Sequence, residues 1–300
     1  MNRRDFLRAT LTVPLLAACS KDDAGPGAKP SPAGPVALQD VGADAAPGLD
    51  IIDAEAELLQ GSARYAFGLS GPDGPIPGAR ATVHLGPDPA KPPTATVPAT
   101  ELTEAGLADR GLYVAQLPFP KAGRYYIAVV ADTPKGKLAG GVQLDVKATS
   151  KAPKPGDKAP LVRTPTKGDP AGAAPLCSRK PKPCTMHDLS LDAALKNGKP
   201  TIVVFAAPAF CQTELCGPDV EIVEGLAKKH RARANFIHVE AFVNASNPTD
   251  GKLAPPLKAF KFDTEPWLYV VDKKGVVSDR ISGAFATSEV AQRLAKVGVS

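Results

Sequence analysis

Residues 201–218 read TIVVFAAPAFCQTELCGP, and this stretch decides the fold of the second half of the chain. Its first seven residues, 201–207, are mostly β-branched or apolar, as in a central strand that is buried on both faces. Pro218 suits the first turn of a helix, where its missing N–H is not needed. We therefore expect a strand that leads through a cysteine pair, Cys211 and Cys216, into a helix.

The segments around this stretch alternate between strand and helix patterns. In the helix after Pro218, apolar side chains repeat at helical spacing, with Glu224 and Lys228 expected as an ion pair on the exposed face. A short helix over 190–196, with Ser190 as its N-cap, precedes the stretch. The elements expected after it are strands over 235–242, 267–272 and 276–281, a hairpin turn at Lys273-Lys274-Gly275, and a helix over 288–297.

Strand, helix, strand, hairpin and helix is the order of the thioredoxin fold. The run 203–211, with Phe210 directly before Cys211, resembles the strand-to-helix junction of envelope thiol-disulfide oxidoreductases of the TlpA and ResA type. Residues 265–272 (EPWLYVVD) resemble their cis-proline loop and the strand after it. The resemblance extends over about 155–298, where Pro155-Gly156-Asp157 resembles the entry segment of such domains.

The resemblance implies that Cys211 attacks substrate disulfides, that Cys216 resolves the mixed disulfide and that Pro266 shapes a docking loop. In this chain four residues separate the two cysteines, where the family has two, so their Cα atoms must still approach within about 7 Å. A second alignment matches Cys216-Gly217-Pro218 to the family motif and makes Cys216 the attacking thiol. We prefer Cys211, because the aromatic residue and the strand end lie directly before it.

Thiol chemistry depends on the ionised form, which a helix N-terminus stabilises through its free N–H groups. Glu265 is unusual beside the expected cis-proline. Its carboxylate would raise the pKa of a nearby thiol, or accept the proton of the second cysteine, unless it points to solvent.

Two other activities and one inert alternative compete with this interpretation. The C-x4-C spacing is also found in one class of peroxiredoxin, but Pro208 stands where those proteins carry a threonine. A copper-handling thioredoxin-fold protein is disfavoured because methionines are few and no histidine follows the last strands. The inert alternative is a structural disulfide on a non-catalytic thioredoxin fold.

A second cysteine pair, Cys177 and Cys184, precedes the domain. With His187 it offers three metal ligands and no clear fourth, and we expect His238 to be a structural strand residue. In an oxidising compartment a structural disulfide between Cys177 and Cys184 is therefore the favoured prediction.

The first residues indicate export. Paired arginines at Arg3 and Arg4, a short apolar run and Leu16-Ala17-Ala18-Cys19 match a twin-arginine signal that ends in a lipobox. Cys19 is then the lipidation site, and the protein is expected in the bacterial cell envelope, lipid-anchored to a membrane and facing the periplasm or exterior. A net charge of +5 without a basic stripe argues against nucleic acid as a partner.

The remaining sequence predicts an all-β module and two irregular segments. Short alternating strands, such as 65–69 and 125–129, predict an immunoglobulin-like sandwich in which Tyr125 caps a corner. The expected layout is a signal over 1–19, a flexible tether over 20–49, the sandwich over 50–148, a proline-rich linker over 149–185 and an α/β thioredoxin-like domain over 186–300. Expected partners are envelope thiols and disulfides or a membrane electron donor, and no cofactor is expected.

Overall fold

The computed structural model describes residues 36–104, 109–210, 216–246, 252–262 and 264–300. The predicted export signal with Cys19, and the predicted nucleophile Cys211, lie outside the described residues. Among the helices that are described, none is long and apolar enough to cross a membrane.

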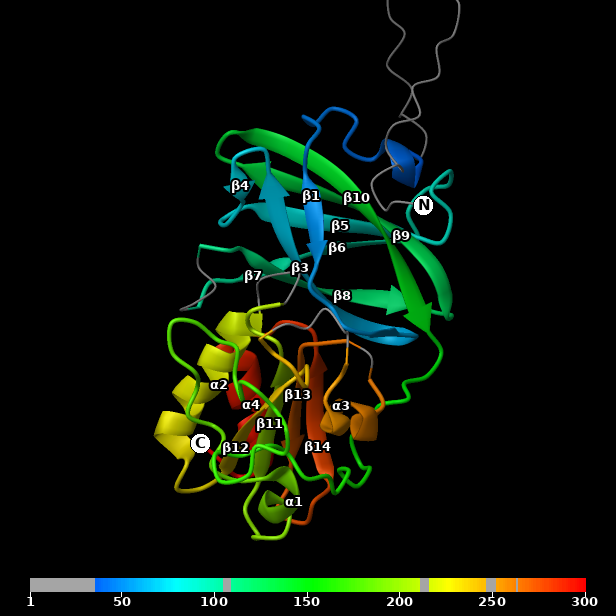
Figure 1. Ribbon diagram of the computed structural model, residues 1–300. Coiled ribbons are helices and arrows are strands. Elements are labelled where there is room, and N and C mark those ends of the chain that lie inside the picture. Colours follow the sequence, from blue (N-terminus) through cyan, green and yellow to red (C-terminus); the bar gives the residue numbers. More distant parts are fainter. Residues whose placement is uncertain (1–35, 105–108, 211–215, 247–251, 263) are drawn as a thin grey trace, which may run out of the picture.

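The first half of the chain forms two five-stranded sheets, drawn at the top of Figure 1. One has the order β1-β3-β8-β7, with β4 attached to β3; its strands are β1 (Asp50–Asp53), β3 (Gly61–Gly71), β4 (Gly74–Pro75), β7 (Thr100–Leu102) and β8 (Leu112–Phe119). The other has the order β2-β10-β9-β5-β6; its strands are β2 (Leu58–Leu59), β5 (Arg80–Gly86), β6 (Ala95–Pro98), β9 (Gly123–Thr133) and β10 (Gly136–Lys147).

The two sheets pack face to face around one core, because alternate residues of their strands point inward. Tyr65 and Phe67 of β3 meet Val83 of β5 and Val129 of β9, and all four side chains are fully buried. The strand predictions over 65–69 and 125–129 are confirmed. Tyr125 caps the expected corner, since its hydroxyl donates to the carbonyl oxygen of Lys121 at 3.1 Å.

The second half is a four-stranded sheet with the order β12-β11-β13-β14. Strand β11 pairs in parallel with β12 and antiparallel with β13, which pairs antiparallel with β14. This is the strand order of the thioredoxin fold, as the sequence predicts. The elements are α1 (Leu191–Ala194), β11 (Thr201–Ala206), α2 (Cys216–His230), β12 (Asn235–Glu240), α3 (Pro255–Phe260), β13 (Trp267–Val271), β14 (Val277–Ser282) and α4 (Thr287–Lys296).

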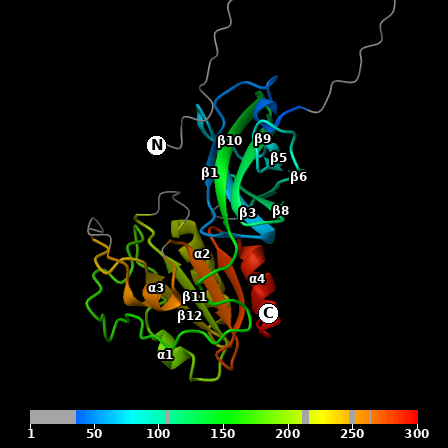
Figure 2. The same ribbon diagram turned by 90° about the vertical axis from the view of Figure 1, so that its right-hand side faces the viewer.

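Strand β11 is buried on both faces, and its period of two divides its side chains between two layers. Ile202 and Val204 join the core that includes residues of α2 and α4. Val203 and Phe205 join the core beneath α1 and α3. The helices therefore cover both faces of the sheet, as Figure 2 shows for α3 and α4. Helix α3 is not among the helices that the sequence predicts.

Two segments expected to be flexible or linker-like are packed where the structure describes them. Leu38, in a short 3-10 helix (Leu38–Asp40), is 2% exposed, and Ala46 pairs with Leu138 of β10. The tether prediction is therefore wrong for 36–49, because these residues find apolar surface on the sandwich. Residues 149–185 contain no helix or strand but run along the thioredoxin-like unit, where Thr164 is buried and Lys158 pairs with Val276.

Glu224, predicted to form an ion pair with Lys228 on the exposed face of its helix, has another partner in the structure. Glu224 is 6% exposed and binds Arg179, with Arg179 Nη2 2.7 Å from Glu224 Oε2. The helical spacing to Lys228 alone could not reveal the partner, because Arg179 comes from the irregular segment packed on α2.

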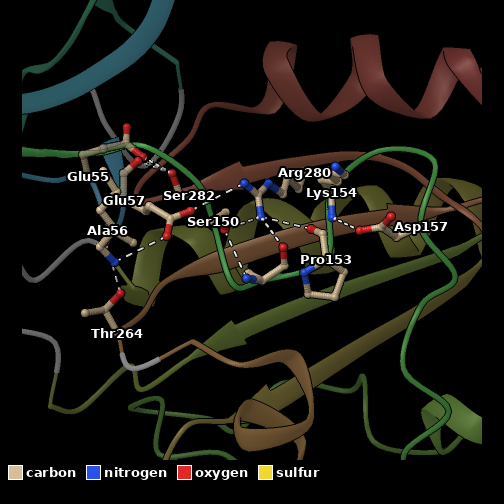
Figure 3. A network of polar contacts seen from close by, with 12 residues as sticks. Glu55, Ala56, Glu57, Ser150, Pro153, Lys154, Asp157, Thr264, Arg280 and Ser282 are labelled. Carbon is tan, nitrogen blue, oxygen red and sulfur yellow. Dashed lines mark hydrogen bonds and ion pairs between the residues drawn. The ribbon is translucent and has the colours of Figure 1, made fainter. Parts of the chain in front are cut away.

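Two arginines connect the sandwich to the thioredoxin-like unit. Arg64 of β3 binds both carboxylate oxygens of Glu289 in α4, at 2.7 and 2.8 Å, and the Ala284 carbonyl oxygen at 2.7 Å. Arg280 of β14 donates to Ser150 and to the Pro153 carbonyl oxygen, and contacts Glu57, as seen in Figure 3. These bonds hold the two units together at charged groups that are mostly buried.

Close backbone packing between the units requires a glycine at position 283. Its φ is +81°, and a Cβ there would lie 2.2 Å from the carbonyl oxygen of Ala54. The next residue donates its N–H to that same oxygen at 2.9 Å. The segment 54–57 therefore lies directly against the loop between β14 and α4.

Glu55 makes this junction sensitive to pH. Burial raises the pKa of Glu55 from 4.5 to about 8. The neighbouring Arg64 opposes this rise only in part, because its charge is shared with Glu289. The folded protein thus binds this proton more tightly than the unfolded chain does. Its stabilising effect is complete below about pH 4.5 and is lost as the pH rises through 8.

Glu55→Gln, which resembles the protonated form, is expected to stabilise the protein at pH 8.5 and to change it little at pH 4. The expected gain at pH 8.5 is about 1 kcal/mol or more, roughly 2–4 °C in the unfolding midpoint. Thermal unfolding at both pH values measures this. A variant less stable than the parent at pH 8.5 would show that Glu55 is ionised and stabilising there.

Candidate functional site

The segment after β11 is held by three backbone hydrogen bonds. Ala207 N donates to Glu265 Oε2 at 2.5 Å, and Ala209 N donates to Ser178 Oγ at 3.1 Å. Phe210 N donates to the Ala207 carbonyl oxygen at 2.9 Å, which closes a turn. Residues 207–210, which come directly before Cys211 in the sequence, are thus fixed at the end of the central strand.

The Phe210 side chain fastens this turn to the domain. Its ring lies edge-on to that of Phe242, with ring centroids 6.4 Å apart, and it packs on the core beneath α1 and α3. The aromatic residue before Cys211 therefore has a packing role, independent of any contact with a substrate.

Cys216 is the first residue of α2, two positions earlier than the predicted helix start at Pro218, and its side chain is fully buried. Its Sγ donates to Glu265 Oε2 at 3.4 Å. The Glu265–Pro266 peptide bond is cis, as the family resemblance implies. The structure thus brings together Cys216, Glu265 and Pro266, three of the four predicted catalytic residues.

The position of Glu265 decides between the alternatives left open by the sequence. Its carboxylate does not point to solvent: one oxygen accepts from both the Cys216 thiol and the Ala207 amide. A carboxylate at this distance can accept the proton of Cys216, and it disfavours a second negative charge on the sulfur. Glu265 can therefore control when Cys216 ionises.

The sandwich borders this site on one side. Thr264, next to Glu265, donates its hydroxyl to the Ala56 carbonyl oxygen at 3.3 Å. The Pro266 carbonyl oxygen accepts from Gly283 N at 2.8 Å, and the Gly283 turn itself packs on Ala54. Residues of the N-terminal half thus cover the flank of the cis-proline loop.

A second group of reactive side chains lies close to the end of β11. Cys177, Cys184, His187 and His238 are each at most 3% exposed, and their ligand atoms all lie within 4.8 Å of one another. Both cysteines are free in the structure, so the predicted disulfide is not formed there. Two imidazoles lie beside Cys184 instead: its Sγ is 3.2 Å from His187 Nε2 and 3.4 Å from His238 Nδ1.

Hydrogen bonding within this cluster shifts the pKa values of the two thiols in opposite directions. A hydrogen bond from Cys184, together with those from both imidazoles, lowers the pKa of Cys177. That same bond to Cys177, and burial, raise the pKa of Cys184. The hydrogen bond between the two sulfurs therefore favours ionisation of Cys177 over ionisation of Cys184.

The sequence analysis missed His238 as a member of this group. His238 lies on β12, more than fifty residues after Cys184, and the pairing of β12 with β11 carries its ring to the cluster. The only sequence signal was a histidine within an apolar strand, which is also typical of a structural residue.

No protein-family model matches this sequence, and the search of curated proteins gives no match either. Among solved structures, a thiol:disulfide interchange protein DsbE from Chlorobium tepidum matches with 16% identity and a TM-score of 0.35, over 49% of this chain and 100% of its own. A thioredoxin family thiol:disulfide interchange protein from Chlorobium tepidum TLS matches with 21% identity and a TM-score of 0.31, over 50% and 99%.

CopC from Methylosinus trichosporium OB3b matches with 12% identity and a TM-score of 0.24, over 34% of this chain and 97% of its own. These likenesses are distant. The strand order, rather than any of them, identifies the thioredoxin-like arrangement.

Glu265→Gln tests the role of this carboxylate. Removing a negative charge 3.4 Å from Cys216 Sγ should shift thiolate formation at Cys216 to lower pH, by roughly 1–2 units. The ultraviolet absorbance of the thiolate, followed against pH, measures the shift, and the same substitution in a Cys216→Ala background is the control. A shift to higher pH would mean that Glu265 stabilises the thiolate.

Proposed function

We propose that this protein is a thiol-disulfide oxidoreductase of the bacterial cell envelope that exchanges disulfides through Cys211 and Cys216. The observation that supports it most is the joint position of Cys216, Glu265 and cis-Pro266 at the end of the central strand. A helix start, a proton acceptor and a docking loop then meet at the point where the chain leads into Cys211.

In the proposed exchange, the Cys211 thiolate attacks one sulfur of a substrate disulfide, and the other sulfur leaves as a thiolate. Cys216 passes its proton to Glu265 and attacks the sulfur of Cys211 in the mixed disulfide. The substrate is released with both sulfurs reduced, and Cys211 and Cys216 are left as a disulfide. An envelope dithiol reverses the sequence, so the same residues serve either direction of transfer.

The sandwich, which we classify as immunoglobulin-like, is proposed to limit which substrates reach this pair. Because residues 54–57 cover one flank of the cis-proline loop, a substrate strand can pair only along the side left open. Extended, exposed cysteine segments fit this geometry better than a broad folded surface.

Trapping experiments test the exchange. Cys216→Ala should accumulate mixed disulfides with envelope proteins, because Cys211 attacks and nothing resolves the product. Cys211→Ala should trap few or none, at least tenfold less by non-reducing gel and mass spectrometry, and the double variant is the control. Equal trapping by both single variants would contradict the assigned roles.

The same protein preparations distinguish disulfide exchange from peroxidase activity. The wild type should reduce or oxidise a model dithiol, and should consume hydroperoxide no faster than the double cysteine variant. Failure to exchange a model dithiol, together with no trapped partner, would overturn the redox assignment. Rapid peroxide turnover that depends on Cys211 would assign the protein as a peroxidase.

We propose further that Cys19 is lipidated after export. A lipid analogue supplied to growing cells should label the wild type and not Cys19→Ala. Replacing Arg3 and Arg4 together by lysine should abolish export, which fractionation measures. Equal labelling of the wild type and Cys19→Ala would exclude this anchor.

A further inference from the structure

We propose that Cys177, Cys184, His187 and His238 form a closed binding site for one zinc ion. This site is separate from the exchange pair, Cys211 and Cys216, and binds zinc whether or not that pair is present. Its role is to hold together the irregular segment 177–187, the end of β11 and strand β12.

The donor atoms have the type and spacing that zinc requires. Two sulfurs and two imidazole nitrogens are a common tetrahedral set for structural zinc. Bond lengths of about 2.3 Å to sulfur and 2.0–2.1 Å to nitrogen place neighbouring donors roughly 3.4–3.8 Å apart in a tetrahedron. Cys184 Sγ lies 3.2 and 3.4 Å from the two imidazole nitrogens, and all four donors lie within 4.8 Å of one another.

The orientation of His238 is set from its far side. Its Nε2 lies 3.2 Å from the Ala206 carbonyl oxygen, which can only accept a hydrogen bond, so the proton belongs on Nε2. Nδ1, the atom that faces Cys184 Sγ, is then the ring nitrogen that can give up its proton in exchange for a metal ion. A carbonyl behind a ligating imidazole is the usual support of a metal site.

The loop that carries the cysteines is held by side chains outside the cluster. Glu224 accepts from Thr185 N and from Arg179 Nη2, both at 2.7 Å, which ties this loop to α2. Ser178 N donates to Glu240 Oε2 at 2.8 Å, which ties it to β12. The positions of Cys177 and Cys184 are therefore built by neighbouring bonds and do not need a disulfide.

The chemistry of the set selects zinc among common ions. Two thiolates and two imidazoles exclude magnesium and calcium, which prefer oxygen ligands. Four protein donors in a buried site leave no open position for a reacting water, as in structural rather than catalytic zinc sites. Binding requires both sulfurs as thiolates, so protons are released as the ion enters.

Metal content of the full-length protein tests the site. Expressed in zinc-supplemented medium, the wild type should contain about one zinc per chain by inductively coupled plasma mass spectrometry. In the Cys184→Ser and His238→Ala variants the zinc content per chain should fall at least tenfold. His84→Ala is the matched control, because it removes an imidazole from β5 of the sandwich and should retain full zinc.

A second measurement avoids dependence on variants that fail to fold. In the native wild type, alkylation should modify Cys177 and Cys184 only after a chelator removes zinc, and cobalt should give the visible absorption of a tetrahedral thiolate complex. A Cys177–Cys184 disulfide in the protein as isolated, or zinc content unchanged in both ligand variants, would overturn the site. Stoichiometric copper in place of zinc would overturn the metal assignment.

The double variant Cys211→Ala, Cys216→Ala distinguishes this site from the proposed exchange activity. It should lack exchange and keep its zinc. Zinc lost in that variant would mean that the exchange cysteines supply the ligands, which would also overturn the separate site.

Discussion

One peptide unit, between Ala206 and Ala207, connects both candidate sites. Its carbonyl oxygen lies 3.2 Å from His238 Nε2, and its N–H donates to Glu265 at 2.5 Å. A trans peptide directs these two groups to opposite sides, so the end of β11 faces the cysteine–histidine cluster on one side and the cis-proline loop on the other. Ala206 ends β11 and Ala207 follows it, and both side chains are fully buried, so one buried peptide unit contacts both sites.

Buried charge is concentrated where segments distant in sequence meet. Arg64, Arg280 and Arg179 each join a carboxylate to backbone or hydroxyl groups, and each has a side-chain exposure of only 12–13%. Removing one partner of such a pair leaves an uncompensated buried charge, which lowers the free energy of unfolding by about 3–5 kcal/mol. These contacts therefore specify how the irregular segments and the sandwich pack on the thioredoxin-like unit, whatever their net contribution to stability.

The irregular segment before the thioredoxin-like unit has a larger role than its composition suggests. Ser178 receives a hydrogen bond from Ala209, next to Phe210, and its own amide binds Glu240 of β12. The loop that leads into Cys211 is thus supported from below by residues adjacent to Cys177. Proline limits the backbone freedom of this segment before folding, which lowers the entropy lost when it packs.

The sequence by itself determined the elements and their order: the doubly buried strand 201–207, the alternating strands of the sandwich and the pairing of Glu265 with a cis-proline. Local periodicity carries the information on the strands within a few residues, whereas the cis-proline is implied by the family resemblance of residues 265–272. Tertiary structure alone decided that Glu265 faces Cys216, that Glu224 binds Arg179 and that His238 joins Cys177 and Cys184. Each of these contacts joins residues more than forty positions apart, so strand pairing and loop packing, rather than spacing along the chain, set their distances.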